Sequence, residues 1–170
     1  MTTESVVPEV LHPWTIYMWA SEEARRRGDR RTGTDHVLLG LLEDPSIEVV
    51  LGVSLQQARQ ALESLDQEAL GALGMGSGTD APPLPMRAVP KKPTIRAVMK
   101  KDRLRMTPAA KKVLEEAVKP MRRKTQVTAQ QVLAQILTLQ PPDPAAVLLG
   151  ALGVNTSEVR RRLDAVTPDS

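Results

Sequence analysis

Residues 34–42, TDHVLLGLL, decide the fold of this chain, because a similar stretch, TAQQVLAQIL, returns at residues 128–137. When the Asp-His pair of the first copy is aligned with the Gln-Gln pair of the second, the apolar residues coincide. They fall at positions i, i+1, i+4 and i+5, a spacing typical of one buried face of a helix. Each copy therefore predicts the same buried helix, capped by Thr34 or Thr128, and two copies predict an internal repeat.

The correspondence continues downstream, where residues 51–54, LGVS, match residues 152–155, LGVN. Each glycine can adopt the left-handed conformation that ends a helix, and the polar residue at the end of each motif can cap the next helix. Gln57 and Glu158 complete a capping-box pattern. The second repeat is six residues longer between the matches, an insertion that we place around residues 141–144, in a connection.

The composition favours a helical core. The 170 residues are enough for one domain or two small ones, and 41% of them are hydrophobic. With two Trp, one Tyr and no Phe, the core must be built from aliphatic side chains and Met, which pack well between helices. We therefore expect an all-α fold of two pseudo-symmetric four-helix repeats, eight helices in total.

Prolines and glycines mark the expected boundaries. We expect an N-terminal tail over residues 1–12, a first repeat over 13–73, a Gly/Pro-rich basic linker over 74–105 and a second repeat over 106–167. The two repeats should form one compact domain. No Gly-Lys-Ser/Thr follows the linker glycines and no predicted strand precedes them, so the sequence predicts no nucleotide site.

Positive charge is concentrated in the middle of the chain. Residues 86–125 contain 14 basic and 3 acidic side chains, whereas residues 1–85 contain 6 and 13. This basic belt, residues 87–124, can attract nucleic acid, anionic lipid or an acidic protein surface. The simpler interpretation is a solvated linker and helix face, because no nucleic-acid motif or interleaved aromatic residue accompanies the charge.

Several functional classes lack the residues they need. The chain contains no cysteine, which excludes disulfides, thiolate zinc sites and thiol catalysis. His12 and His36 are the only histidines and neither has a second ligand at helical spacing, so we expect no metal and no cofactor. There is no signal-type segment and no apolar run long enough to span a bilayer. The sequence thus predicts a non-enzymatic protein in the cytoplasm.

Aromatic residues gather near the start of the first predicted helix. Trp14, Tyr17 and Met18 lie at i, i+3 and i+4. Core packing is the first interpretation of this stripe and an aromatic ligand site is the alternative. Together with the neighbouring apolar face of Ile16, Trp19, Ala20 and Ala24, the stripe is also wide enough to meet a partner.

The repeated signatures resemble the Clp N-terminal repeat, the double four-helix module at the front of the Clp-type AAA+ unfoldases. Residues 33–42 match the family's Gly-Thr-Glu-His-hydrophobic-Leu-Leu-Gly-Leu run. Residues 106–115, MTPAAKKVLE, match the opening of its second repeat. The likeness covers about residues 13–70 and 107–166.

The resemblance implies a docking module without catalytic activity, which receives adaptors or protein substrates for the ATPase rings. The chain contains no Walker motif, so we expect either an excised N-terminal domain or a stand-alone Clp-N protein that regulates proteolysis. Its implied partners are adaptors, substrates, domain-directed small molecules or a Clp ATPase or protease component. The alternative function is a nucleic-acid-associated regulator that uses the basic belt.

In Gram-positive members of the family, the Glu before each His helps to hold arginine-phosphorylated substrates. Here that position is Asp35, one methylene shorter, and Gln130, whose neutral amide cannot form a charge-assisted pair. Both departures argue against phosphoarginine binding. The first interpretation of His36 is a partly buried helix residue that hydrogen-bonds across the repeat, and the alternative is a ligand or a base. The predicted partner-binding residues are Thr34, Asp35, His36, Gln130, Gln131, Lys100, Lys101, Arg103 and Arg105.

Overall fold

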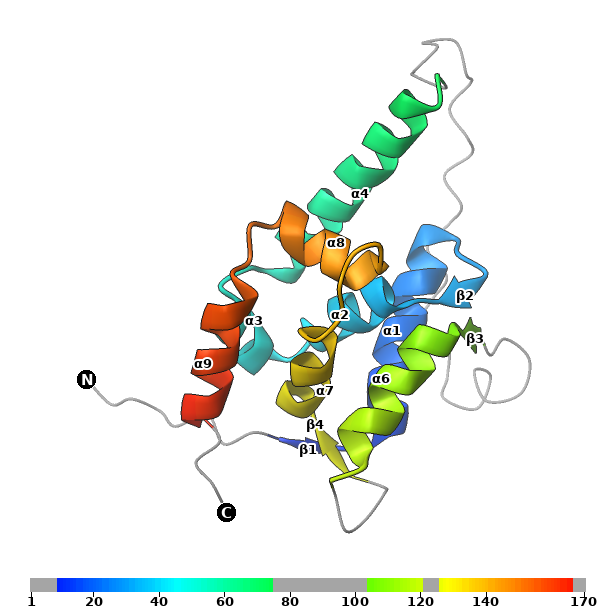
Figure 1. Ribbon diagram of the computed structural model, residues 1–170. Helices are drawn as coiled ribbons and strands as arrows, with labels where there is room; N and C mark the ends of the chain where they lie inside the picture. Colours follow the sequence, from blue (N-terminus) through cyan, green and yellow to red (C-terminus); the bar gives the residue numbers. More distant parts are fainter. Residues whose placement is uncertain (1–8, 75–103, 121–125, 167–170) are drawn as a thin grey trace.

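A computed structural model describes residues 9–74, 104–120 and 126–166 of the chain. Within these ranges the fold is mostly helical (Figure 1), as the aliphatic composition predicted. None of the described helices is both long and apolar enough to cross a membrane.

In the described residues, short strands precede α1, α2, α6 and α7. The first described range contains β1 (Val10–Leu11), α1 (Pro13–Arg27), β2 (Arg31–Thr32), α2 (Thr34–Leu41), α3 (Pro45–Leu51) and α4 (Leu55–Ala72). The later ranges contain β3 (Arg105–Met106), α6 (Pro108–Val118), β4 (Val127–Thr128), α7 (Ala129–Ile136), α8 (Pro144–Ala151) and α9 (Thr156–Val166).

Many helix ends follow the local signals in the sequence. Gly28 ends α1 and Gly52 ends α3, with φ of 81° and 71° in the left-handed region. At the start of α7, the Thr128 hydroxyl accepts a hydrogen bond from the Gln131 backbone N–H at 3.2 Å. The Gln131 side-chain oxygen accepts one from the Thr128 N–H at 2.9 Å. The cap by Thr128 was predicted from the sequence.

The predicted cap of α2 is wrong. The N-cap is Gly33, and Thr34 is the first helical residue. The Thr34 hydroxyl instead donates to Asp143 Oδ1, at 2.7 Å, at the start of α8. A buried hydroxyl needs a partner, and a carboxylate from the distant helix α8 provides it.

The predicted capping box at the start of α9 forms only in part. Asn155 Oδ1 accepts hydrogen bonds from the backbone N–H groups of Ser157 and Glu158, both at 3.1 Å. The Glu158 carboxylate does not complete the box, because it accepts a hydrogen bond from Arg162 one turn later at 2.6 Å. An ion pair within α9 therefore takes the place of the second capping bond.

Four two-residue strands join distant parts of the chain, which the all-α prediction did not include. Strand β1 pairs with β4 in antiparallel orientation, and β2 pairs with β3 in parallel orientation. Residues 10–11 of the predicted tail and residue 105 of the predicted linker therefore belong to strands of the fold. Linker residues 75–103 lie outside the described residues.

Helix α2 lies at the centre of the molecule (Figure 1). All its residues are buried, including Thr34, Asp35 and His36 at its first turn. It contacts α1, α4, α6, α7 and α8, which explains why its sequence is apolar around most of its circumference. By contrast, α4 has only Ala58 and Leu62 fully buried, and its C-terminal half projects away from the other helices (Figure 1).

Candidate functional site

The predicted partner-binding residues do not form one open surface. Thr34, Asp35, His36 and Gln130 are buried, with exposed fractions of 1%, 7%, 3% and 3%. Gln131 is half-buried in the capping box of α7, and Arg105 is exposed on β3. Lys100, Lys101 and Arg103 lie outside the described residues.

The negative charge of the Asp35 carboxylate is balanced by an arginine of the same chain. Arg27, at the end of α1, donates from Nη1 to Asp35 Oδ2 at 3.1 Å, and its second amino group binds Asp66 of α4. Burial by itself would raise the pKa of Asp35, but hydrogen bonds from His36 and the nearby charges of His36 and Arg27 outweigh it and lower that pKa. The Asp35 carboxylate thus already has a guanidinium partner within its own chain.

His36 completes the backbone cap of α2. Its Nδ1 accepts a hydrogen bond from the Gly33 N–H at 3.0 Å, and its Nε2 lies 2.9 Å from Asp29 Oδ2. In the neutral ring Nδ1 accepts, so Nε2 carries the proton and donates to Asp29. In the protonated ring Nδ1 also carries a proton, which faces Asp35 Oδ1 at 3.2 Å. Burial opposes protonation, but Asp35 and Asp29 outweigh it and raise the pKa of His36. This agrees with the structural interpretation of His36, although both partners are close in sequence rather than across the repeat.

Gln130 occupies the position in α7 that Asp35 occupies in α2. Its side-chain oxygen is buried and has no hydrogen-bond partner among the described residues. No group of three or more His, Asp or Glu side chains in the described ranges is placed to hold a metal ion.

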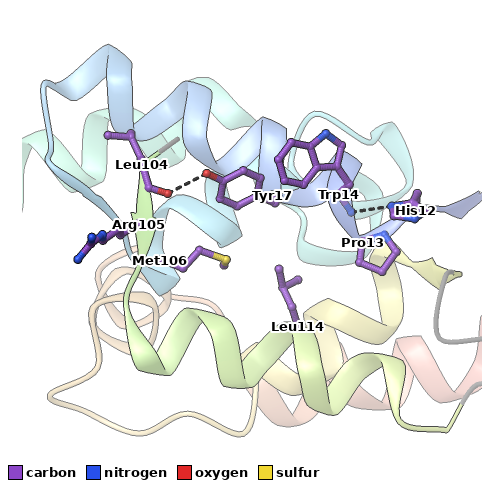
Figure 2. A pocket seen from close by; sticks show the side chains of 8 residues that line it. All are labelled: His12, Pro13, Trp14, Tyr17, Leu104, Arg105, Met106 and Leu114. Atoms are coloured by element: carbon purple, nitrogen blue, oxygen red, sulfur yellow. Dashed lines mark hydrogen bonds between the residues drawn. The ribbon is translucent and has the colours of Figure 1, made fainter. Parts of the chain in front are cut away.

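An open apolar pocket lies between α1, β3 and α6 (Figure 2). Its volume is about 490 Å³, within the range common for ligand-binding pockets. In Figure 2, the side chains of Tyr17, Trp14, Met106 and Leu114 surround a common space. The lining residues are His12, Pro13, Trp14, Tyr17, Leu104, Arg105, Met106 and Leu114.

Local and long-range contacts hold this pocket open. His12 caps α1 by accepting from the Trp14 N–H at 3.1 Å, and the Trp14 and Tyr17 ring centroids lie 4.8 Å apart. The Tyr17 hydroxyl donates to the Leu104 carbonyl at 2.8 Å, which fixes the start of β3 against α1. The aromatic wall and the β3 wall are therefore joined by a bond between residues 87 positions apart.

The sequence indicated half of this pocket. Trp14 and Tyr17 belong to the stripe for which core packing was the first interpretation and an aromatic ligand site the alternative, and in the fold they line an open space. Met106 carried no signal of its own, since nothing local shows that β3 returns to the first described range.

A second hollow of about 300 Å³ lies where the two LGV motifs meet. Residues 51–53 and residues 152–154 both line it, together with Arg162 of α9. Arg162 Nη1 donates to the Val50 carbonyl at 3.3 Å, near the C-terminal end of α3. The two motifs that match in sequence are therefore neighbours in space.

Three ion pairs that sequence patterns did not predict hold α4 to the rest of the molecule. Glu23 of α1 is 2% exposed and accepts from two nitrogens of Arg59 on α4, one of them at 3.0 Å. Arg59 also lies 3.5 Å from Glu43. Arg27 bridges to Asp66 farther along α4. These pairs form across elements, so no local pattern in the chain marks them.

In comparisons with known proteins, the sequence matches no family model and no curated protein.

Proposed function

We propose that this protein is a non-catalytic protein-interaction module of the Clp protease and chaperone system. The observation that carries the proposal is the open apolar pocket between α1, β3 and α6, where Trp14 and Met106 remain partly exposed. A pocket of this kind can receive an apolar side chain of an adaptor or a protein substrate. The proposal includes binding and release but no chemical step.

The fold proposed for this module is a pair of four-helix repeats, α1–α4 and α6–α9. One line of support is that the short strands pair between the two sets of helices. Strands β1 and β3 each precede the first helix of a set, and β2 and β4 each precede the second. Each set's first strand pairs with the other set's second strand. The two ladders differ in direction, so this exchange is approximate.

Contacts between the helices support the same pairing. Helices α2 and α7, which contain the two aligned stretches, contact each other. Helix α3 contacts α9, and the corresponding pair α8 and α4 is also in contact. The shared hollow between the two LGV motifs lies between matching corners of the two sets. An arrangement with an approximate two-fold axis accounts for these contacts together.

The pocket lies where the proposed repeats meet. Its aromatic wall comes from α1, and its Met106 and Leu114 wall comes from β3 and α6. Phosphoarginine recognition is not part of the proposal, because Asp35 is engaged by Arg27 and Gln130 carries no charge. Apolar contact is therefore the recognition mode that the geometry supports.

Site-specific photo-crosslinking tests this function. Leu104 lines the pocket and is half-buried, so replacing it with p-benzoylphenylalanine places a crosslinker at the pocket wall. The matched control replaces Arg161, which is exposed on α9. In cells that produce the protein naturally, we expect position 104 to capture a Clp adaptor, an unfoldase or protease subunit, or a substrate of the protease.

A polar change in the pocket provides the companion test. Met106→Gln keeps the approximate length of the side chain but makes it polar, so the capture at position 104 should weaken while the fold is retained. The proposal is wrong if positions 104 and 161 capture the same proteins, or if no Clp component or protease substrate is among the proteins specific to position 104.

A further inference from the structure

Two arginines face each other across the β2–β3 ladder. Arg31 of β2 and Arg105 of β3 are register partners, and both are exposed. Neighbouring strands lie about 5 Å apart, and side chains of register partners lie on the same face of a ladder. The guanidinium groups of Arg31 and Arg105 therefore start from adjacent backbone positions on one face.

Neither arginine is neutralised within the described part of the chain. No described carboxylate forms an ion pair or hydrogen bond with Arg31 or Arg105, although Arg25, Arg27 and Arg59 all lie near carboxylates. Asp29, two residues before Arg31, is directed to His36. Like charges placed directly opposite each other in a ladder destabilise it. An anion bound between the two groups would remove this repulsion.

The arginine pair lies beside the apolar pocket. Successive residues of a strand point to opposite faces, so Met106 turns into the pocket while Arg105 turns outward on the other side of β3. Figure 2 shows this arrangement, with the Met106 side chain directed toward Leu114 and the Arg105 side chain directed away from it. A bound partner segment that extends from the pocket across β3 thus passes from an apolar site to a cationic one.

We infer that the partner of this site is a peptide segment in which an acidic side chain closely follows a bulky apolar one. The apolar side chain fills the pocket, and the carboxylate lies between Arg31 and Arg105. This inference rests on the proposed function, since it uses the same pocket. Charge complementarity selects an acidic partner, and we assign the adjacent apolar space to an apolar peptide side chain. An oligonucleotide, whose bases also stack on aromatic side chains, is an outcome of the test.

Fluorescence anisotropy with short labelled peptides tests the inference. One set of peptides pairs a single Leu, Phe or Trp with Glu at successive distances along the chain. The matched set has Gln in place of every Glu. For the best pair, we expect the Glu peptide to bind the wild-type protein roughly tenfold more tightly, with the difference shrinking as salt is added.

Arginine variants test which side chains cause the preference for the Glu peptide over the Gln peptide. Arg31→Gln and Arg105→Gln should each reduce the Glu-over-Gln preference by about fivefold or less, and the double variant should abolish it. Arg31→Gln should still bind the Gln peptide as the wild type does, because Arg31 does not line the pocket. Arg161→Gln removes an exposed cation from α9 and should leave the preference intact. Circular dichroism of each variant establishes that the fold is retained.

The outcomes separate the inference from the proposed function. If Glu and Gln peptides bind equally, or if the double variant keeps the preference, the inference is overturned while apolar binding in the pocket stands. If no peptide binds the wild type, the inference is overturned, and crosslinking at position 104 still decides the proposed function independently. A labelled single-stranded oligonucleotide that binds more tightly than every peptide, and is lost in the double variant, would overturn the inference in favour of nucleic acid.

Discussion

Gly40 of α2 lies directly against the backbone of Ala20 in α1. A Cβ atom added at Gly40 would come within 2.7 Å of the Ala20 backbone nitrogen. Side-chain adjustment cannot relieve a contact with backbone atoms, so the two helices can approach this closely only because position 40 has no side chain. At the aligned position of α7 the residue is Gln135, so the close crossing belongs to α1 and α2 alone.

Gly40→Ala should therefore destabilise the protein by about 2 kcal/mol, as expected for overpacking in a core. Gly150→Ala is the matched control, because Gly150 lies within α8 and an added Cβ there meets no atom within 4 Å. That change should leave stability unchanged or raise it by about 0.5 kcal/mol through helix propensity. Urea unfolding followed by circular dichroism measures both. Equal effects of the two substitutions would contradict the close crossing.

We expect stability to depend on Glu23 and Arg59 being paired, and much less on whether both charges are present. Arg59→Met leaves the buried Glu23 carboxylate without its main partner and should lower the free energy of unfolding by about 3 kcal/mol. Adding Glu23→Met to that variant removes the unpaired charge, so much of the stability should return. Chemical denaturation of the single and double variants checks this, and additive losses would show that the two side chains do not depend on each other.

Protonation of His36 should stabilise the folded state. Its pKa is raised in the folded protein above the ordinary value of 6.5, so its contribution is fully present below about pH 6.5 and is lost as the pH rises through the folded-state pKa. The free energy of unfolding should accordingly fall over that interval. Urea unfolding at a series of pH values measures the slope.

The control for this titration is His36→Gln. Glutamine is the residue that α7 uses at the corresponding position, where the Gln131 oxygen accepts the capping bond from Thr128. The variant should keep the cap of α2 and lose the pH dependence above pH 6.5 that the wild type shows. Identical pH profiles for the two proteins would exclude His36 as the titrating group.

Thr34 should stabilise the contact between α2 and α8 through its hydroxyl. Thr34→Val keeps the shape of the side chain but removes the donor to Asp143 Oδ1, and should cost about 1.5 kcal/mol. Thr34→Ser keeps the hydroxyl and should cost less. Thermal unfolding of both variants provides the comparison. If the serine variant is no more stable than the valine variant, the bond to Asp143 contributes little.

Local signals predicted the helices well. Thr107 before Pro108 caps α6, Asp143 before Pro144 caps α8, and Ser54 with Gln57 caps α4. Each signal acts through a hydrogen bond between residues no more than three positions apart, so the sequence alone contains the interaction. The short strands lacked such a signal, because two residues are too few for an alternating pattern.

The burial of the predicted site could not be predicted in the same way. Asp35 and His36 are polar residues at a helix start, where side chains are commonly exposed, yet α2 is surrounded by other helices. Their partners Arg27 and Asp29 lie only a few residues upstream, but the turn that brings them back is a feature of the folded chain. Arg105, expected within a linker, belongs instead to a strand beside the pocket.

By itself, the sequence determined where α4, α6 and α8 begin and which helix faces are apolar, because caps and helical periodicity operate over a few consecutive residues. Only the tertiary structure decided which polar groups are satisfied and which remain available. Thr34 is matched by a carboxylate 109 positions away, whereas Arg31 and Arg105 meet each other without a described carboxylate between them. Neutralisation of a charge depends on distance in space, which spacing along the chain does not specify.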